Sequence, residues 1–167
     1  DLLLLETCYD ALNCKAALHA INQLEEELGT MAPVMVSVTV NNHSGRTFTG
    51  QTLEEIYASI QHYPILSFGV NCSFGVANMR PIIERIASQI PKYISFYPNA
   101  GLPNALGEYH DTPDFIANHI KAMAKDGLLN IVGGCCGTTP QHIQKIAQSI
   151  KSLPPHTPSN GSCLLYT

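Results

Sequence analysis

Apolar runs alternate with amphipathic stretches along the chain, and the alternation repeats five times. Short runs rich in Val, Ile, Leu and Phe, typical of strands in a parallel sheet, occupy 2–7, 33–40, 65–71, 93–97 and 128–132. Each run precedes a segment whose apolar residues recur at helical spacing, at 10–29, 52–62, 78–90, 111–127 and 139–151. Five consecutive strand–helix units predict an α/β fold with a parallel sheet, its first strand buried on both faces.

Capping residues mark the ends of several predicted helices. Asp10 stands where a helix N-cap is expected, and Gly29 where a left-handed C-terminal residue is expected. Thr52 followed by Glu55 is a capping-box signature. Asn78 is the expected cap of the third helix. The helix boundaries are therefore predicted by local chemistry as well as by periodicity.

Two architectures fit five strand–helix units. One is a doubly wound sheet, and the other is five-eighths of a (β/α)8 TIM barrel, which normally takes about 250 residues. The chain opens with Asp1 and then four leucines, with no polar lead-in. This start favours an incomplete barrel of about five βα units. We interpret 1–152 as the partial barrel domain and 153–167, rich in Pro and Ser, as a linker towards a following module.

Composition excludes several classes of function. Hydrophobic residues make up 45% of the 167 residues and charged residues 13%, with a formal net charge of −4. This balance gives no electrostatic case for binding nucleic acid or an anionic membrane surface. No apolar run approaches the ~18 residues of a membrane-spanning helix, and no secretory signal opens the chain. The expectation is a cytoplasmic protein whose six cysteines are reduced.

Three cysteines follow the carboxyl ends of two predicted strands. Cys72 follows the third strand, and Cys135 and Cys136 follow the fifth, between glycines that permit a sharp turn. Carboxyl ends of parallel strands meet at one rim, and alternate barrel strands share a layer of side chains. Three thiolates at one point repel unless a cation lies between them, and zinc accepts thiolate sulfur in tetrahedral geometry. The spacing favours a three-thiolate metal site, while buried apolar cysteines or a vicinal disulfide remain alternatives.

Other polar residues at this rim are weaker candidates. Glu6 ends the first strand and would either bind a substrate amine or remain a solvated carboxylate. Asn99 follows the fourth strand and would be an oxygen ligand, a substrate contact or a turn residue. Cys8 falls just past the first strand and Cys14 at the helical core spacing, so neither is an expected ligand, and Cys163 fits a free thiol in the tail.

Several of these segments together resemble a known family. They are 44–47 (SGRT), 68–73 (FGVNCS), 97–104 (YPNAGLPN), 107–109 (GEY) and 130–140 (NIVGGCCGTTP). They resemble the homocysteine-binding domain of cobalamin-dependent methionine synthases, within the zinc-dependent homocysteine S-methyltransferases. The resemblance extends to about Lys151.

The resemblance implies a fold and a set of site residues. The family fold is a (β/α)8 barrel, of which this chain would hold strands four to eight. Cys72, Cys135 and Cys136 match the zinc ligands. Asn99 matches the residue that can occupy the fourth zinc position without homocysteine, and Glu6 matches the glutamate that helps hold the substrate amino group.

The resemblance also implies an activity. A zinc-activated homocysteine thiolate accepts a methyl group from methylcobalamin, with methyltetrahydrofolate as the ultimate donor, and methionine forms. Cobalamin and folate would be bound by other modules of the full-length chain. The family's Asp-Gly-Ala-Met-Gly segment, which lines the homocysteine pocket, does not occur here, so the isolated chain is expected to have little activity. The alternatives are a methyltransferase that uses betaine or a methylsulfonium donor, and a non-catalytic structural zinc domain.

Overall fold

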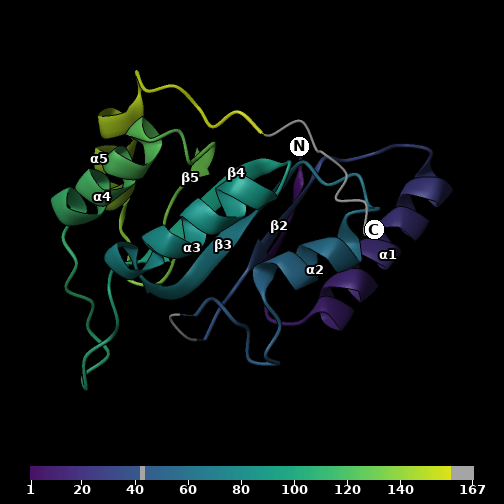
Figure 1. Cartoon of the computed structure of the whole chain (residues 1–167), viewed down its shortest axis with the longest axis horizontal. Helices are drawn as coiled ribbons and strands as arrows, with labels where there is room; N and C mark the ends of the chain where they lie inside the picture. The colour runs from purple at the N-terminus through teal and green to yellow at the C-terminus, as the bar shows by residue number, and fades with distance from the viewer. Residues whose placement is uncertain (42–43, 159–167) are drawn as a thin grey trace.

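Strands and helices alternate throughout the computed structural model, which describes residues 1–41 and 44–158 (Figure 1). The elements of these residues are β1 (Leu3–Cys8), α1 (Ala11–Leu28), β2 (Val34–Val38), α2 (Leu53–Ile60), β3 (Ser67–Gly75), α3 (Val76–Gln89), β4 (Tyr93–Asn99), α4 (Pro113–Lys125), β5 (Ile131–Val132) and α5 (Pro140–Ile150). The predicted order of strand–helix units is confirmed. None of the helices in the described part of the chain is both long and apolar enough to cross a membrane.

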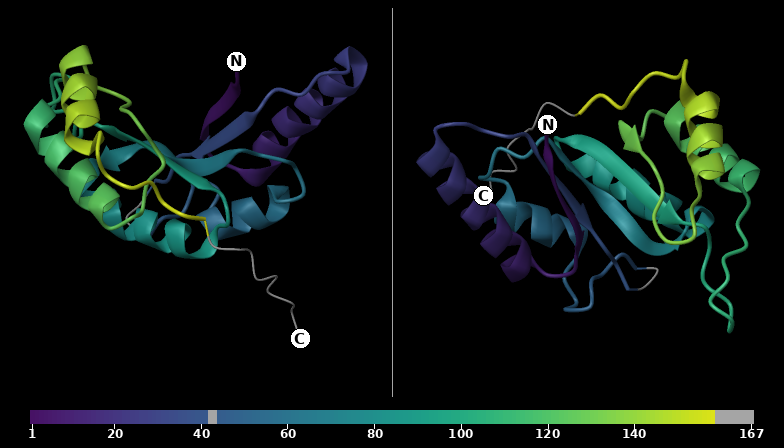
Figure 2. Two further views of the ribbon diagram at one scale, coloured as in Figure 1. Left: turned by 90° about the horizontal axis from the view of Figure 1, so that it is seen from above. Right: turned by 180° about the vertical axis from the view of Figure 1, so that it is seen from behind.

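The strands form one parallel sheet in the order β1-β2-β3-β4-β5. Figure 2 shows that the sheet is curved and that the helices lie along its convex side. A doubly wound sheet reverses its strand order and carries helices on both faces. The sequential order and one-sided helices instead have the arrangement of part of a barrel wall.

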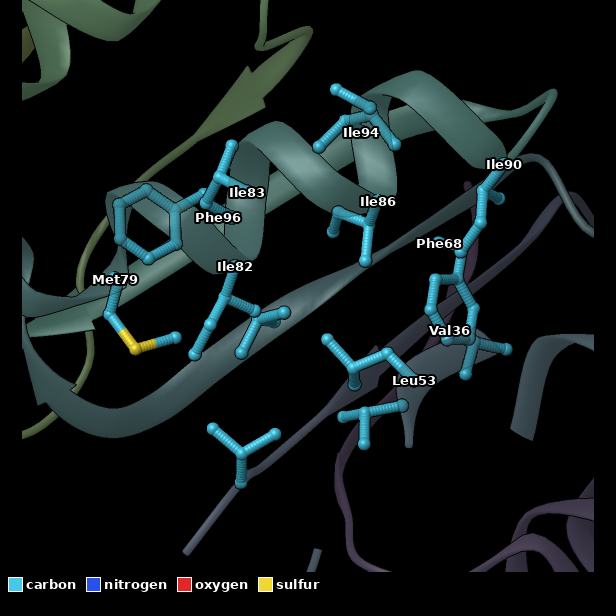
Figure 3. Close-up of a cluster of buried hydrophobic side chains, with 14 of the residues drawn as sticks. Val36, Leu53, Phe68, Met79, Ile82, Ile83, Ile86, Ile90, Ile94 and Phe96 are labelled. Carbon is cyan, nitrogen blue, oxygen red and sulfur yellow. The ribbon is translucent and has the colours of Figure 1, made fainter. Parts of the chain in front are cut away.

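The main core lies between the helices and the convex face of the sheet (Figure 3). Val36, Phe68 and Ile94 stand in one register row across β2, β3 and β4, and all three are fully buried. The Phe68 ring meets the Tyr57 ring of α2 edge to face, with centroids 5.5 Å apart. Burial of this apolar row fixes which side chains of each strand face the helices and which face the concave side.

Small residues occupy the next register row, which faces the concave side. Ser37, Gly69 and Ser95 are aligned across β2, β3 and β4. A β-carbon on Gly69 would lie 1.9 Å from the Ser95 carbonyl oxygen, so the close approach of β3 and β4 requires glycine there.

The predicted caps are mostly confirmed. The Asp10 side chain accepts a hydrogen bond from the Asn13 amide at 2.6 Å, and Gly29 ends α1 with φ of 66°. Thr52 and Glu55 form the reciprocal capping box of α2. The exception is α3, which begins two residues before Asn78 because β3 runs on and its last residue is the N-cap.

The expectation of a first strand buried on both faces is wrong. Leu2, Leu3 and Leu4 are 49%, 41% and 38% exposed. Within the described residues β1 pairs only with β2, so one edge of β1 has no neighbouring strand. The apolar run shows that the strand can be covered on both faces, but it does not show whether other elements of the chain cover it.

The last strand is shorter than predicted. β5 spans only Ile131–Val132, and just before it the Ile94 amide of β4 donates to the Asn130 side chain at 2.8 Å instead of to a strand carbonyl. The His156 amide donates to the Leu129 carbonyl at 3.0 Å. His156 Nδ1 also contacts the Gly127 carbonyl at 2.8 Å, and the Asn130 amide donates to the His156 carbonyl at 2.7 Å. The start of the proposed 153–167 linker is thus bound to the segment before β5.

Candidate metal centre

Two elements bring three thiols together at the carboxyl end of the sheet. Cys72 belongs to β3, and Cys135 and Cys136 lie in the turn between β5 and α5. The Cys136 sulfur lies 3.7 Å from the Cys72 sulfur and 3.9 Å from the Cys135 sulfur. All three sulfurs lie within 4.8 Å of one another. A disulfide needs about 2.05 Å between sulfurs, so these are three free thiols.

The separation of the sulfurs fits a tetrahedral metal ion. Zinc–sulfur bonds of about 2.3 Å at tetrahedral angles place the sulfurs about 3.8 Å apart. The two distances from the Cys136 sulfur, 3.7 and 3.9 Å, bracket that value, and the Cys72 and Cys135 sulfurs lie within 4.8 Å of each other. Three sulfur ligands leave the fourth position of the tetrahedron for another ligand. The cluster can therefore hold a zinc ion as an open, three-thiolate site.

The surroundings of Cys135 oppose ionisation of its thiol. Burial raises the pKa of Cys135 to about 11, and the negative charge of Cys72 adds to the increase. A hydrogen bond from the Asn71 amide acts in the opposite direction. At neutral pH the Cys135 thiol is therefore protonated until a cation supplies compensating positive charge.

An irregular end of β3 directs Cys72 towards the other two cysteines. Cys72 and Ser73 both have left-handed backbones, with φ of 59° and 66°, and the register between β3 and β4 shifts beyond Cys72. Ser73 Oγ accepts a hydrogen bond from the Val40 amide at 2.9 Å and contacts Thr39 Oγ1 at 3.1 Å. Such a bulge re-aims a side chain at the end of a strand, and here the hydrogen bonds to the end of β2 hold the strained backbone in place.

The cysteine turn is bound to the end of β4. The Cys135 amide donates to the Pro98 carbonyl at 2.8 Å, and the Cys136 carbonyl accepts from the Ala100 amide at 2.9 Å. Asn99, which is 4% exposed, accepts a hydrogen bond from the Cys136 amide through Oδ1 at 3.1 Å. Asn99 therefore lies at the metal centre, where its observed contact positions the turn.

A glycine on the far side of the turn packs against an aromatic ring. Gly137 has φ of 77°, and a β-carbon there would lie 2.2 Å from Cγ of Tyr109. Desolvation raises the pKa of the Tyr109 phenol, and the negative charge of the neighbouring Cys136 raises it further. Only glycine satisfies both the left-handed backbone and this close contact.

We expect Gly137→Ala to weaken zinc binding and to lower the free energy of unfolding by about 2 kcal/mol or more. A left-handed alanine costs roughly 1–2 kcal/mol, and relief of the clash with Tyr109 must move the ring or the cysteine turn. Zinc competition titration and urea unfolding measure the two effects. Gly29→Ala is the control, since Gly29 has φ of 66° and open space at its β-carbon. Equal zinc affinities in the two variants would contradict the expectation.

The structure places Glu6 at the same rim but not in the cysteine cluster. Glu6 lies near the end of β1 and is exposed. Burial raises the pKa of the Tyr97 phenol of β4, and the negative charge of the Glu6 carboxylate adds to the increase. Cys14 is buried in the core as its helical spacing predicts, and Cys8, the last residue of β1, is buried as well. Neither belongs to the cysteine cluster, and Cys163 lies outside the described residues.

Sequence reasoning missed three residues that build the site. Asn71 is buried in the middle of β3 and contacts Thr7, Ser37 and Cys135. Ser73 holds the bulge, and Thr7 has a left-handed backbone with φ of 57° beside Glu6. The only available signal was that Asn71, polar in an apolar run, directly precedes a candidate ligand.

Comparison with known families agrees with the chemistry of the centre. The family model described as homocysteine S-methyltransferase matches residues 1–150. The chain belongs to the homocysteine S-methyltransferase family.

Solved structures show a similar fold. They include homocysteine methyltransferase MmuM from Escherichia coli in apo, oxidised and metallated forms, with TM-scores of 0.69, 0.70 and 0.66 and identities of 20%, 20% and 21%. The alignments each cover 89% of this chain and 49%, 45% and 44% of the respective MmuM chains. The chain thus spans about half the length of these structures.

Proposed function

We propose that this chain is the zinc-binding part of a homocysteine S-methyltransferase, in which homocysteine sulfur accepts a methyl group. The observation that carries the proposal is the cluster of three sulfurs on the rim of the sheet, in which both distances from the Cys136 sulfur match a tetrahedral zinc site. The family membership supplies the substrate class. The fold proposed for the complete protein is a (β/α)8 barrel, with β1 to β5 as strands four to eight.

The residues of the rim have distinct proposed tasks. Cys72, Cys135 and Cys136 would hold the zinc ion. When bound, zinc stabilises the homocysteine thiolate at neutral pH, and three thiolates on a divalent ion keep the site electron-rich. Glu6 is the proposed partner of the substrate ammonium group, since its exposed carboxylate lies at the same rim.

Asn99 is the proposed fourth ligand in the absence of substrate. Its Oδ1 already accepts one hydrogen bond, from the Cys136 amide, and an amide oxygen has a second lone pair. Departure of this weak ligand would open the position for the substrate sulfur, while the hydrogen bond to Cys136 keeps the cysteine turn in place.

The finer proposal is the methionine synthase type, with methylcobalamin as methyl donor and methyltetrahydrofolate behind it. The segments 44–47 and 97–104 support this type, because they carry its resemblance. Cobalamin and folate modules of the same full-length protein are then the partners, and the cytoplasm is the proposed compartment. Betaine or a methylsulfonium compound is the alternative methyl donor. A full-length reading frame that continues into a folate module would exclude this alternative.

X-ray absorption tests whether the site is open. The zinc-loaded chain is expected to show three sulfur neighbours and one oxygen or nitrogen neighbour. In a complete barrel, homocysteine should replace the light atom by a fourth sulfur. Four sulfurs from protein alone would identify a closed structural site and contradict the proposed function.

A further inference from the structure

Asn71 of β3 lies where the end of β1, strand β2 and the cysteine turn meet. Its side chain is 1% exposed. Oδ1 accepts hydrogen bonds from the Thr7 amide at 2.9 Å and from the Ser37 hydroxyl at 2.7 Å. Nδ2 donates to Thr7 Oγ1 at 2.8 Å and points its other hydrogen at Cys135 Sγ, 3.9 Å away. All the hydrogen-bonding positions of this amide are therefore taken.

The orientation of the amide is dictated by its neighbours. The Thr7 backbone amide can only donate, so the Asn71 oxygen must face it. This leaves the Asn71 nitrogen on the side of Cys135, where it can only donate to sulfur. A donor that faces sulfur stabilises the anionic form of that sulfur, the form that binds a metal ion.

The same side chain also fixes the backbone beside Glu6. Thr7 has φ of 57°, and the β1–β2 register shifts between Leu5 and Cys8. Two hydrogen bonds to one asparagine hold Thr7 in this sparsely populated conformation. Asn71 thereby joins the strand end that carries Glu6 to the sulfur of Cys135.

We propose that Asn71 is a positioning residue of the metal centre, which holds the Cys135 thiolate by an N–H···S hydrogen bond and links it rigidly to the end of β1. This inference rests on the proposed function. Glu6 and the metal would hold opposite ends of the same substrate, and Asn71 sets the relative position of these two ends of the site.

The test is Asn71→Asp in the 167-residue chain, titrated with zinc and with cobalt(II). Aspartate has the same shape and can still accept the hydrogen bonds from Thr7 and Ser37, but it cannot donate to sulfur and it adds a negative charge beside the thiolates. We expect zinc affinity to fall by about 10–100-fold, as for the loss of an outer-shell hydrogen bond. The sulfur-to-cobalt charge-transfer band should shift as well, which a purely structural role would not cause.

Asn130→Asp is the matched control. Like Asn71, Asn130 joins two segments through its side-chain amide. Its oxygen accepts from the Ile94 amide and its nitrogen donates to the His156 carbonyl. Asn130 lies just before β5, away from the cysteine rim. Both substitutions should lower the free energy of unfolding measured in urea. Only Asn71→Asp should change the metal affinity and the position of the sulfur-to-cobalt charge-transfer band. Equal metal affinity in wild type and Asn71→Asp, or an equal loss in Asn130→Asp, would overturn the role of Asn71.

A measurement on the wild-type chain avoids any dependence on the folding of variants. With a spin-half cadmium isotope bound, the Asn71 Nδ2 protons should show scalar coupling to the metal through the N–H···S hydrogen bond. Bound cadmium without this coupling would overturn the inference and leave the metal site standing. Failure of the wild-type chain to bind zinc, cobalt(II) or cadmium would instead overturn the proposed function, and the inference with it.

Discussion

Alanine in place of Cys72, Cys135 or Cys136 is expected to lower zinc affinity by more than about 100-fold, beyond what an outer-shell contact costs. Each substitution removes one of three sulfurs that lie within 4.8 Å of one another. Two thiolates and a weak amide oxygen make a poor set of ligands for zinc at neutral pH, where protons compete for the remaining sulfurs. Metal content after dialysis and competition titration measure the loss.

Cys8→Ser and Cys163→Ser are the controls for the number of thiols. Cys8 is buried in the core and is not part of the cluster. Both variants should retain about one zinc ion per chain. Full zinc occupancy in any of the three alanine variants, or its loss in Cys163→Ser, would show that zinc is bound elsewhere.

Local signals in the sequence predicted the elements and the contents of the metal centre. Strand–helix alternation set the order of the sheet, and capping chemistry placed the ends of α1 and α2. Cys72 and the Cys135–Cys136 pair were expected at one rim, because carboxyl ends of parallel strands share an edge. The structure brings their sulfurs together.

What the sequence did not predict depends on contacts between distant segments. Left-handed backbones at Thr7, Cys72 and Ser73 have no local signature, since none of these residues is a glycine. Their conformations are held by partners 33 to 64 residues away, such as Val40 for Ser73 and Asn71 for Thr7. A contact between distant segments also accompanies the short β5, since the Ile94 amide of β4 donates to the side chain of Asn130, 36 residues away.

Exposure of β1 carries a large expected consequence for stability. Leu2, Leu3 and Leu4 are each roughly half exposed, and the outer edge of β1 has no partner among the described residues. Covering the exposed halves of three leucines, at about 2 kcal/mol for each fully buried side chain, is worth about 3 kcal/mol. An uncovered apolar edge strand also favours association between chains.

We expect three further βα units, placed ahead of β1 to complete the barrel, to raise the melting temperature by about 10 °C, since 1 kcal/mol shifts it by roughly 2–4 °C in chains of this size. Homocysteine affinity should rise in the same step, because the added strands would cover the concave face of the sheet beside Glu6 and the cysteine cluster. Thermal melts and isothermal titration of homocysteine compare the zinc-loaded chain with the extended one.

Leu3→Lys in the 167-residue chain is the matched edge variant: a lysine on the exposed edge should reduce self-association without restoring homocysteine binding. Equal melting temperature and equal homocysteine affinity in the short and extended chains would show that five strands already form the complete binding unit.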